Sequence, residues 1–406
     1  MPEKFYKKVL KNGMTVILEK RKLPVVSLAF AVRAGSNNED LNEKGLFHFM
    51  EHMLYKGTEK REAKDIAGEI EKIGGDLNGF TNENMTAFWC KLPSKHLNVG
   101  LDVLSDMIKN SKFDKKEFEK EKGVILEEIK MYDDSPRDRS IKEAVKLLFG
   151  GPMSLWIAGN SETVKNINLE NMKENYKNIF RPEHLVLCVV GDADFDFLCK
   201  WAAKNFPVSK KKIDLEKVDI PLKKLENKTE KRKSLQQANF VMVYHAPRSS
   251  DKKKSYAARV LNTLMAQGLS SRLFTEIREK RNLAYIVKGA LDMNDNFSYG
   301  LIYVGCMKEN LEKVKKLIVE EFEKVSKDLE KKEFDQAKEQ LLGNYDISSE
   351  DSVSQMEDLL AFEINGDAKE LYNFKEDVSK VKIEDVKKLA GEIAKKNGVF
   401  ILEPED

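Results

Sequence analysis

Apolar residues alternate or cluster along the chain in a pattern that predicts short strands separated by longer helices. Near the N-terminus, residues 6–10 and 14–18 are strand-like and flank Asn12-Gly13, a dipeptide that accepts positive φ and favours a tight hairpin. Residues 25–32 form a continuous apolar run that predicts a core strand. Residues 45–57 follow, with apolar side chains around most of the circumference of a helix, so we expect this helix to be buried.

The second half of the chain repeats the order of predicted elements found in the first half, namely strand, helix, paired strands, helix, helix. A strand is predicted at 239–245, and helices at 252–265 and 270–280 follow it. Paired strands at 284–290 and 298–306 precede two long helices. A repeated order of this kind is typical of an internal duplication.

A short identical segment supports the duplication, because Lys-Lys-Glu-Phe opens a predicted long helix at 115–118 and again at 331–334. Lysine is dense and apolar residues are sparse at 207–234, which is typical of a linker. We therefore predict an α+β protein with an N-terminal domain at 1–206 and a homologous C-terminal domain at 235–406. Each domain is expected to be an antiparallel-rich sheet packed with helices.

The composition narrows the range of functions. The 406 residues include 70 basic and 68 acidic ones, a near balance that argues against a nucleic-acid or membrane-surface binder. No apolar stretch approaches the roughly 18 residues needed to span a membrane. The four cysteines are isolated, and the N-terminal residues do not resemble a signal peptide. We expect a cytoplasmic protein without nucleic-acid or membrane partners.

The buried helix at 45–57 carries a candidate metal site. His48 and His52 stand one helical turn apart, and Glu51 lies between their directions on the same face. Two imidazoles four residues apart on one helical face can bind a divalent metal, and zinc in hydrolytic sites usually takes a third protein ligand. Glu51, next to a ligand, is suited to act as a base on a water molecule at the metal.

The third ligand is expected on the predicted helix at 114–132, whose apolar positions mark one buried face. Glu121 and Glu128 are seven residues apart, share one direction on the helix and lie beside that face. The spacing nominates both carboxylates and does not distinguish which of them contacts the metal.

Together, residues 45–58 and 121–128 resemble the inverted-motif zinc peptidases, the family of pitrilysin, insulin-degrading enzyme and the mitochondrial processing peptidase. The resemblance covers essentially the whole chain and is greatest to the short bacterial members. It implies that His48, His52 and Glu128 bind one zinc ion per chain. It also implies that Glu51 is the general base for a zinc-bound water. Glu121 is implied to be a carboxylate that orients one of the metal ligands and tunes its basicity.

The same resemblance extends to the second half. It implies that Arg278 and Tyr285 hold the substrate backbone and polarise the scissile carbonyl. It also implies that residues 77–83 are an edge strand that binds an extended peptide; from the residues alone, an internal hairpin strand is equally compatible. The strand residues expected to contact substrate are Asn78, Gly79, Phe80 and Thr81.

The second half departs from the first at the metal site. Aligned through the Lys-Lys-Glu-Phe segments, Glu128 corresponds to Asn344 and Glu121 to Ala337, and no His-x-x-Glu-His occurs there. The chain is therefore expected to hold one metal site and a degenerate copy. Asn282 also stands where the family commonly has glycine.

The resemblance implies a zinc endopeptidase that hydrolyses short or unfolded peptides inside a chamber. The two halves are expected to face each other as a clamshell formed by two chains, most simply a homodimer, because this chain has both the metal set and the Arg/Tyr pair. Two alternatives stay open: a non-catalytic scaffold or assembly subunit of the same fold, and a catalytic subunit that needs an inactive partner chain.

Overall fold

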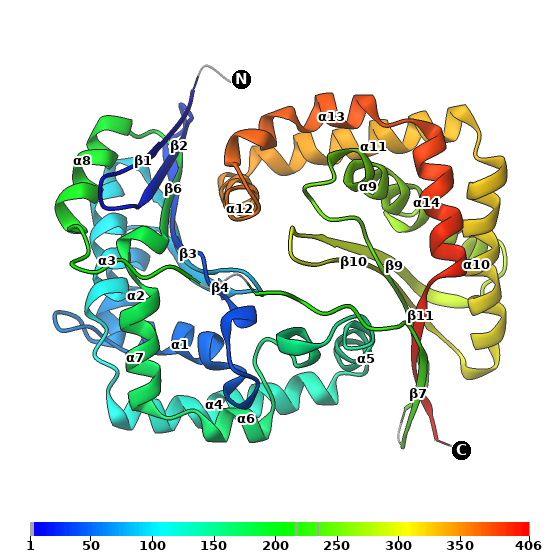
Figure 1. The fold of residues 1–406 in the computed structure, drawn as a ribbon, viewed down its shortest axis with the longest axis horizontal. Helices are drawn as coiled ribbons and strands as arrows, with labels where there is room; N and C mark the ends of the chain where they lie inside the picture. Colours follow the sequence, from blue (N-terminus) through cyan, green and yellow to red (C-terminus); the bar gives the residue numbers. More distant parts are fainter. Residues whose placement is uncertain (1–3, 216–217, 234, 406) are drawn as a thin grey trace. The chain divides into compact units, whose positions relative to one another are not determined.

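The computed structural model describes residues 4–215, 218–233 and 235–405, and its chain forms two compact units (Figure 1). The first unit is drawn from Met1–Lys130, Leu155–Val218 and Ser348–Tyr372. The second is drawn from Met131–Ser154, Asp219–Ile347 and Asn373–Asp406. Each unit is built on one β-sheet, which agrees with the predicted α+β class.

The two units exchange segments, whereas the predicted domains were contiguous. The chain passes into the second unit after Val218, inside the predicted linker 207–234, of which positions 216, 217 and 234 lie outside the described residues. Met131–Ser154, from the first half of the sequence, packs within the second unit, and Ser348–Tyr372 packs within the first. The clamshell arrangement of the halves stays a prediction.

The sheet of the first unit has the strand order β1-β2-β6-β3-β5-β4. β2 and β6 run parallel, and the other neighbours are antiparallel. The predicted hairpin is confirmed, because β1 and β2 pair on either side of Asn12-Gly13 and Gly13 has a φ of +88°. The strands are β1 (Phe5–Val9), β2 (Thr15–Lys20), β3 (Val25–Val32), β4 (Asp76–Thr81), β5 (Thr86–Pro93) and β6 (Leu185–Gly191).

Apart from the helix at residues 136–145, which belongs to the second unit, the helices of the first half cover one face of this sheet. Successive side chains on a strand point to opposite faces, and alternate residues such as Leu28, Phe30 and Val32 join the helices in one apolar core. The helices from the first half of the chain are α1 (Leu46–Leu54), α2 (Ala63–Glu71), α3 (Leu97–Asn110), α4 (Lys115–Asp134), α5 (Pro136–Val145), α6 (Ser161–Asn166), α7 (Leu169–Ile179) and α8 (Phe195–Asn205).

The opposite face of the first sheet is covered by α12 (Ser352–Ile364), which packs on β3 and β6. Polar residues fix this contact: the hydroxyls of Ser27 and Ser352 are hydrogen-bonded at 2.8 Å, and Gln355 Nε2 donates to Glu19 Oε2 at 2.7 Å. All four side chains are buried, so each requires a partner of this kind.

The sheet of the second unit has the order β7-β11-β8-β10-β9. β7 and β11 are parallel and the rest antiparallel, the same sequence of pairings as in β2-β6-β3-β5-β4. This shared topology supports the duplication. The strands are β7 (Asn227–Arg232), β8 (Ala238–His245), β9 (Ala284–Met293), β10 (Ser298–Cys306) and β11 (Gly398–Pro404).

The second sheet also has a helix from the other half of the sequence. One face packs into an apolar core with the later helices, and α5 packs on β8 and β11. Arg139 of α5 anchors this contact by a two-pronged ion pair to Glu230 of β7, at 2.8 and 3.0 Å. The later helices are α9 (Lys252–Ala266), α10 (Leu311–Asp328), α11 (Lys331–Glu350), α13 (Phe374–Lys380) and α14 (Ile383–Lys395).

Two local features differ from the predicted elements. The predicted helix at 270–280 is instead a π-helical segment, Phe274–Glu279. Asn282, which follows it, has a φ of +51°, a conformation that asparagine tolerates better than other residues with a β-carbon. Asparagine thus meets the backbone requirement at a position where glycine was expected. Within residues 4–215, 218–233 and 235–405, no helix combines the length and the apolar character needed to cross a membrane.

Candidate metal centre

Helix α1 is held in place at its N-terminus by tight packing and by a buried carboxylate. Gly45, which precedes the helix, has a φ of +103°, and a β-carbon there would lie 2.6 Å from the Ala158 carbonyl oxygen. Glu39 accepts hydrogen bonds from the Gly45 and Phe47 backbone amides at 3.0 and 2.6 Å. A carboxylate at this end of a helix satisfies free N–H groups and complements the helix dipole.

Glu39 is paired with Lys44 in a fully buried site that the sequence analysis missed. Lys44 Nζ lies 3.5 Å from Glu39 Oε2 and donates to the Ser36 carbonyl. Burial raises the pKa of Glu39 from 4.5 to about 7, against the opposing effects of Lys44 and the two backbone donors. Burial likewise lowers the pKa of Lys44. The pair orients the start of α1. Helical periodicity in the sequence does not predict that Glu39 and Lys44 pair, because neither residue lies on a predicted helix.

Replacing Lys44 by methionine is expected to destabilise the fold by roughly 3 kcal/mol at pH 7, because a buried carboxylate loses its counter-charge. Without Lys44 the pKa of Glu39 rises further above its unfolded value. The loss is therefore small below pH 4.5, where the carboxyl is protonated in both states, and grows as the pH rises. Urea unfolding of the wild type and of Lys44→Met, from below pH 4.5 to pH 7, measures this loss in the free energy of unfolding. Adding Glu39→Gln should recover part of the stability at pH 7; no recovery would contradict the charge argument.

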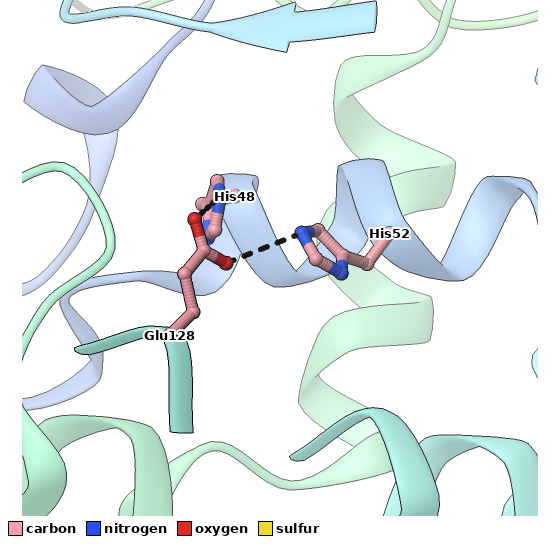
Figure 2. A group of neighbouring side chains, drawn as sticks. All are labelled: His48, His52 and Glu128. Atoms are coloured by element: carbon pink, nitrogen blue, oxygen red, sulfur yellow. Dashed lines mark ion pairs between the residues drawn. The ribbon is translucent and has the colours of Figure 1, made fainter. Parts of the chain in front are cut away.

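The side chains of His48, His52 and Glu128 meet in one group, with one potential ligand atom from each lying within 4.8 Å of the others. Figure 2 shows the Glu128 carboxylate, from α4, facing the two imidazoles of α1. Glu128 Oε1 is 3.8 Å from His48 Nε2, and Oε2 is 3.7 Å from His52 Nε2. The helices α1 and α4 therefore bring the two histidines and one of the two nominated carboxylates together.

The donor set and its spacing fit a zinc ion. Zinc–ligand distances of about 2.0–2.1 Å place tetrahedral ligand atoms roughly 3.3 Å apart. The Glu128 oxygens lie 3.7 and 3.8 Å from the two Nε2 atoms, so a modest approach of the side chains would bring them to that separation. Burial, with the neighbouring His52, lowers the pKa of His48 to about 3, so this imidazole is neutral, as a metal ligand must be. The His48 Nδ1 atom is buried and has no hydrogen-bond partner among the residues described.

Glu121, the second nominated carboxylate, lies behind His52. Its Oε2 is 3.2 Å from His52 Nδ1, the ring nitrogen that faces away from Glu128, and its Oε1 pairs with Lys56 at 2.7 Å. Glu121 is only 3% exposed, so Lys56 offsets the cost of burying its charge. A carboxylate in this place fixes the tautomer and orientation of an imidazole.

Glu51 is held at the edge of the group by β4. Its Oε2 accepts a hydrogen bond from the Thr81 hydroxyl at 2.7 Å. Burial raises the pKa of Glu51, with Thr81 and His52 opposing the shift and Glu128 adding to it. Burial and the Glu128 charge thus weaken the preference for the ionised carboxylate and favour proton uptake, which suits a residue that accepts a proton during a reaction.

The strand β4 is the last strand of the first sheet and pairs with β5, so it is an edge strand rather than an internal one. Among its predicted contact residues, Asn78 and Phe80 flank Gly79. A β-carbon at Gly79 would lie 2.7 Å from the Tyr55 hydroxyl and 3.4 Å from Glu51 Oε1. That hydroxyl is buried and has no hydrogen-bond partner within the part of the chain that is described. Glycine therefore leaves room for two polar groups beneath the edge strand.

Arg278 and Tyr285 lie together in the second unit. Arg278 Nη1 donates to the Tyr285 carbonyl oxygen at 2.9 Å, and its guanidinium lies over the Phe274 ring. Both residues line a pocket of about 560 Å³, which also contains Asn344, the residue that aligns with Glu128. The pocket thus has an amide where the first unit has the Glu128 carboxylate.

Two family models match the chain. The model described as insulinase (peptidase family M16) matches residues 15–148, and the model described as the peptidase M16 inactive domain matches residues 166–341. The first matched range includes the His48–Glu128 group, and the second includes Arg278 and Tyr285.

Relatives and solved structures give a consistent result. The uncharacterized zinc protease YmxG of Bacillus subtilis is 31% identical over 351 residues, which are 85% of this chain and 84% of the relative. A protease from Helicobacter pylori has a TM-score of 0.90, with 20% identity and 99% of both chains covered. A peptidase M16 inactive domain from Pseudomonas fluorescens has a TM-score of 0.88 and 20% identity. The match covers 99% of this chain and 98% of that one.

Proposed function

Because the chain belongs to peptidase family M16, we propose that it is a zinc-dependent endopeptidase that hydrolyses short or unfolded peptides. The observation that carries this proposal is the convergence of His48, His52 and Glu128 beside Glu51. A site with three ligands leaves a fourth position for the reacting groups, as catalytic zinc sites do.

Each side chain has a distinct role in the proposed reaction. His48, His52 and Glu128 would hold the zinc ion, with Glu121 orienting His52. Zinc supplies a Lewis acid that polarises a carbonyl and lowers the pKa of water. Glu51 takes the proton from the attacking water and returns it to the leaving amine, and Thr81 keeps its carboxylate in position.

The substrate is proposed to bind as an extended chain. The exposed edge of β4 offers main-chain hydrogen bonds that place little demand on sequence, which suits unfolded peptides. Arg278 and Tyr285 would contact the substrate backbone, and the Tyr285 hydroxyl would stabilise the negative charge that develops on the scissile carbonyl oxygen.

Metal removal tests the proposal directly. We expect the purified protein to contain about one zinc per chain, measured by atomic emission, and to cleave a quenched fluorescent peptide. Treatment with a strong chelator should abolish cleavage, and added zinc should restore it. A protein that is loaded with zinc but cleaves no peptide from a broad unfolded-peptide library would contradict the proposed function.

We further propose that the active form is a cytoplasmic homodimer, because one chain contains both the metal set and the Arg/Tyr pair. The four cysteines are free and buried, which agrees with a reducing compartment. Light scattering of the purified protein should give the mass of two chains, and this protein should cleave peptide without any other chain. A catalytic subunit that needs an inactive partner would not be active alone.

The competing function is a non-catalytic scaffold subunit. The likeness to an M16 inactive domain, in a family model and in a solved structure, is the observation that favours it. Retention of His48, Glu51, His52, Glu121 and Glu128 favours the enzyme instead, because a scaffold has no need of a buried histidine pair with a carboxylate.

A further inference from the structure

The pocket in the second unit is the structural counterpart of the metal centre in the first. A β-carbon on Gly289, in the edge strand β9, would lie 2.8 Å from Asn262 Oδ1 and 2.7 Å from Ala266 Cβ, two residues four apart on α9. Gly79, in the edge strand β4, likewise faces Glu51 and a second side chain four residues further on. Asn262 therefore takes the place of Glu51.

Neutral amides replace two carboxylates of the metal centre in this counterpart. Asn262 corresponds to Glu51, and Asn344, which lines the pocket, aligns with Glu128. A carboxylate contributes the negative charge that attracts a cation. Without these two charges, the pocket no longer favours a positively charged ligand.

The pocket also has a positive charge of its own. Arg278 and Lys288 line it, and no acidic residue is among the described residues that do. The Arg278 side chain is 45% exposed, and the Glu279 carboxylate, 4.0 Å from its Nε, does not line the pocket. Lys288 is exposed and forms no ion pair with any residue that the structure describes. A hollow lined by one sign of charge attracts groups of the opposite sign.

The other walls of the pocket indicate which anion would fit. Phe274, Ile286 and Val287 make part of the lining apolar, so a suitable ligand has apolar groups as well as a charge. Tyr285, in the same pocket, is the residue proposed to face the scissile carbonyl. In an endopeptidase the substrate chain continues on both sides of that bond, so it offers the pocket a side chain rather than a terminus. Glutamate combines two methylene groups with a carboxylate.

We propose that Lys288 is a specificity-determining residue that selects substrates with a glutamate close to the cleaved bond. The glutamate carboxylate would pair with the Lys288 ammonium in the positive field of Arg278, and its methylene groups would pack on Val287. Asn344 belongs to the same device, because an acid at its position would repel the substrate carboxylate. The inference rests on the proposed function, since it names the substrates of the same site.

Cleavage of paired peptides by the full-length, zinc-loaded protein tests this. The probes are quenched fluorescent peptides with blocked termini, in which one glutamate moves through a neutral sequence, each matched by a glutamine version. At one position kcat/KM should favour glutamate by roughly 3- to 5-fold, as expected of a partly exposed charge pair, and by less at high salt.

Three variants show whether the pocket is the source of this preference. Lys288→Met and Asn344→Asp should bring the glutamate-to-glutamine ratio close to one. Lys313→Met, which removes an exposed lysine of α10 outside the pocket, should keep the wild-type ratio. Because both peptides meet the same enzyme, partial unfolding of a variant does not alter the ratio. An unchanged ratio in Lys288→Met, or a wild-type ratio of one at every position, would overturn the inference.

A binding measurement does not depend on cleavage. Glu51→Gln protein, with and without Lys288→Met, is titrated with fluorescein-labelled glutamate and glutamine peptides, and fluorescence anisotropy gives each Kd. A preference that appears only with unblocked peptides overturns the inference, because the pocket would then hold a terminal carboxylate. If the wild type cleaves none of the peptides, equal Kd values also overturn it. A preference that depends on Lys288 in such a protein supports the glutamate site and counts against the proposed function alone.

Discussion

Replacing Glu51 by glutamine is expected to lower kcat for peptide cleavage by about 10²- to 10⁴-fold, the contribution of a positioned acid–base group. The amide keeps the size of the side chain and can still bond to Thr81, but it cannot accept a proton from water. Glu51 is not in the His48–His52–Glu128 group, so the zinc content should stay at the wild-type value.

Three measurements on one preparation make this result interpretable. Zinc analysis shows whether the site is intact, thermal unfolding shows whether the fold is, and peptide turnover shows the effect on the reaction. Glu59→Gln, at an exposed position beyond the same helix, is the control for the loss of one negative charge. Wild-type turnover by a zinc-loaded Glu51→Gln protein would eliminate Glu51 as the base.

Replacing Glu128 by glutamine is expected to weaken zinc binding by more than about 100-fold. Removal of groups that merely orient ligands costs 10- to 100-fold in metal affinity, and loss of a direct ligand should exceed that. Glu128 faces both Nε2 atoms, whereas Glu121 contacts the Nδ1 atom of His52, on the other side of that ring. Glu121→Gln should therefore give a smaller loss, roughly 10- to 100-fold.

The neighbouring Glu127 supplies the control for this series. Its side chain is 73% exposed and pairs with Lys130 on the same helix, so Glu127→Gln should bind zinc as the wild type does. Competition with a chromogenic chelator measures all three affinities. If Glu121→Gln loses more zinc affinity than Glu128→Gln, the assigned roles of the two carboxylates are reversed.

Local patterns in the sequence predicted much of this candidate site. The helical spacing placed His48, Glu51 and His52 on one face and nominated Glu121 and Glu128, because a regular helix fixes relative directions. Spacing did not separate the two carboxylates, since residues seven apart share a direction. The crossing of α1 and α4 separates them, by placing Glu128 against one edge of the imidazole of His52 and Glu121 against the other.

Other parts of the structure could not be predicted from periodicity, which reports that a residue is buried but not what it is buried against. Glu39 and Lys44 occur in a polar loop segment and form a buried pair only in the fold. Tyr285 is the extra residue of a β-bulge, because Ile286 pairs with Gly305 and Ala284 with Cys306, and this depends on the register of β9 against β10. Periodicity also does not indicate which sheet a helix covers, and the packing of α5 on β8 and β11 and of α12 on β3 and β6 is seen only in the fold.

The exchange of α5 and α12 has a consequence for how the chain can be divided into fragments. A fragment ending at 206 would lack α12 and leave the β3 and β6 face of its sheet uncovered, and a fragment starting at 235 would lack α5. Each half of the chain therefore depends on one helix from the other half to complete its core, so we expect neither fragment to fold alone.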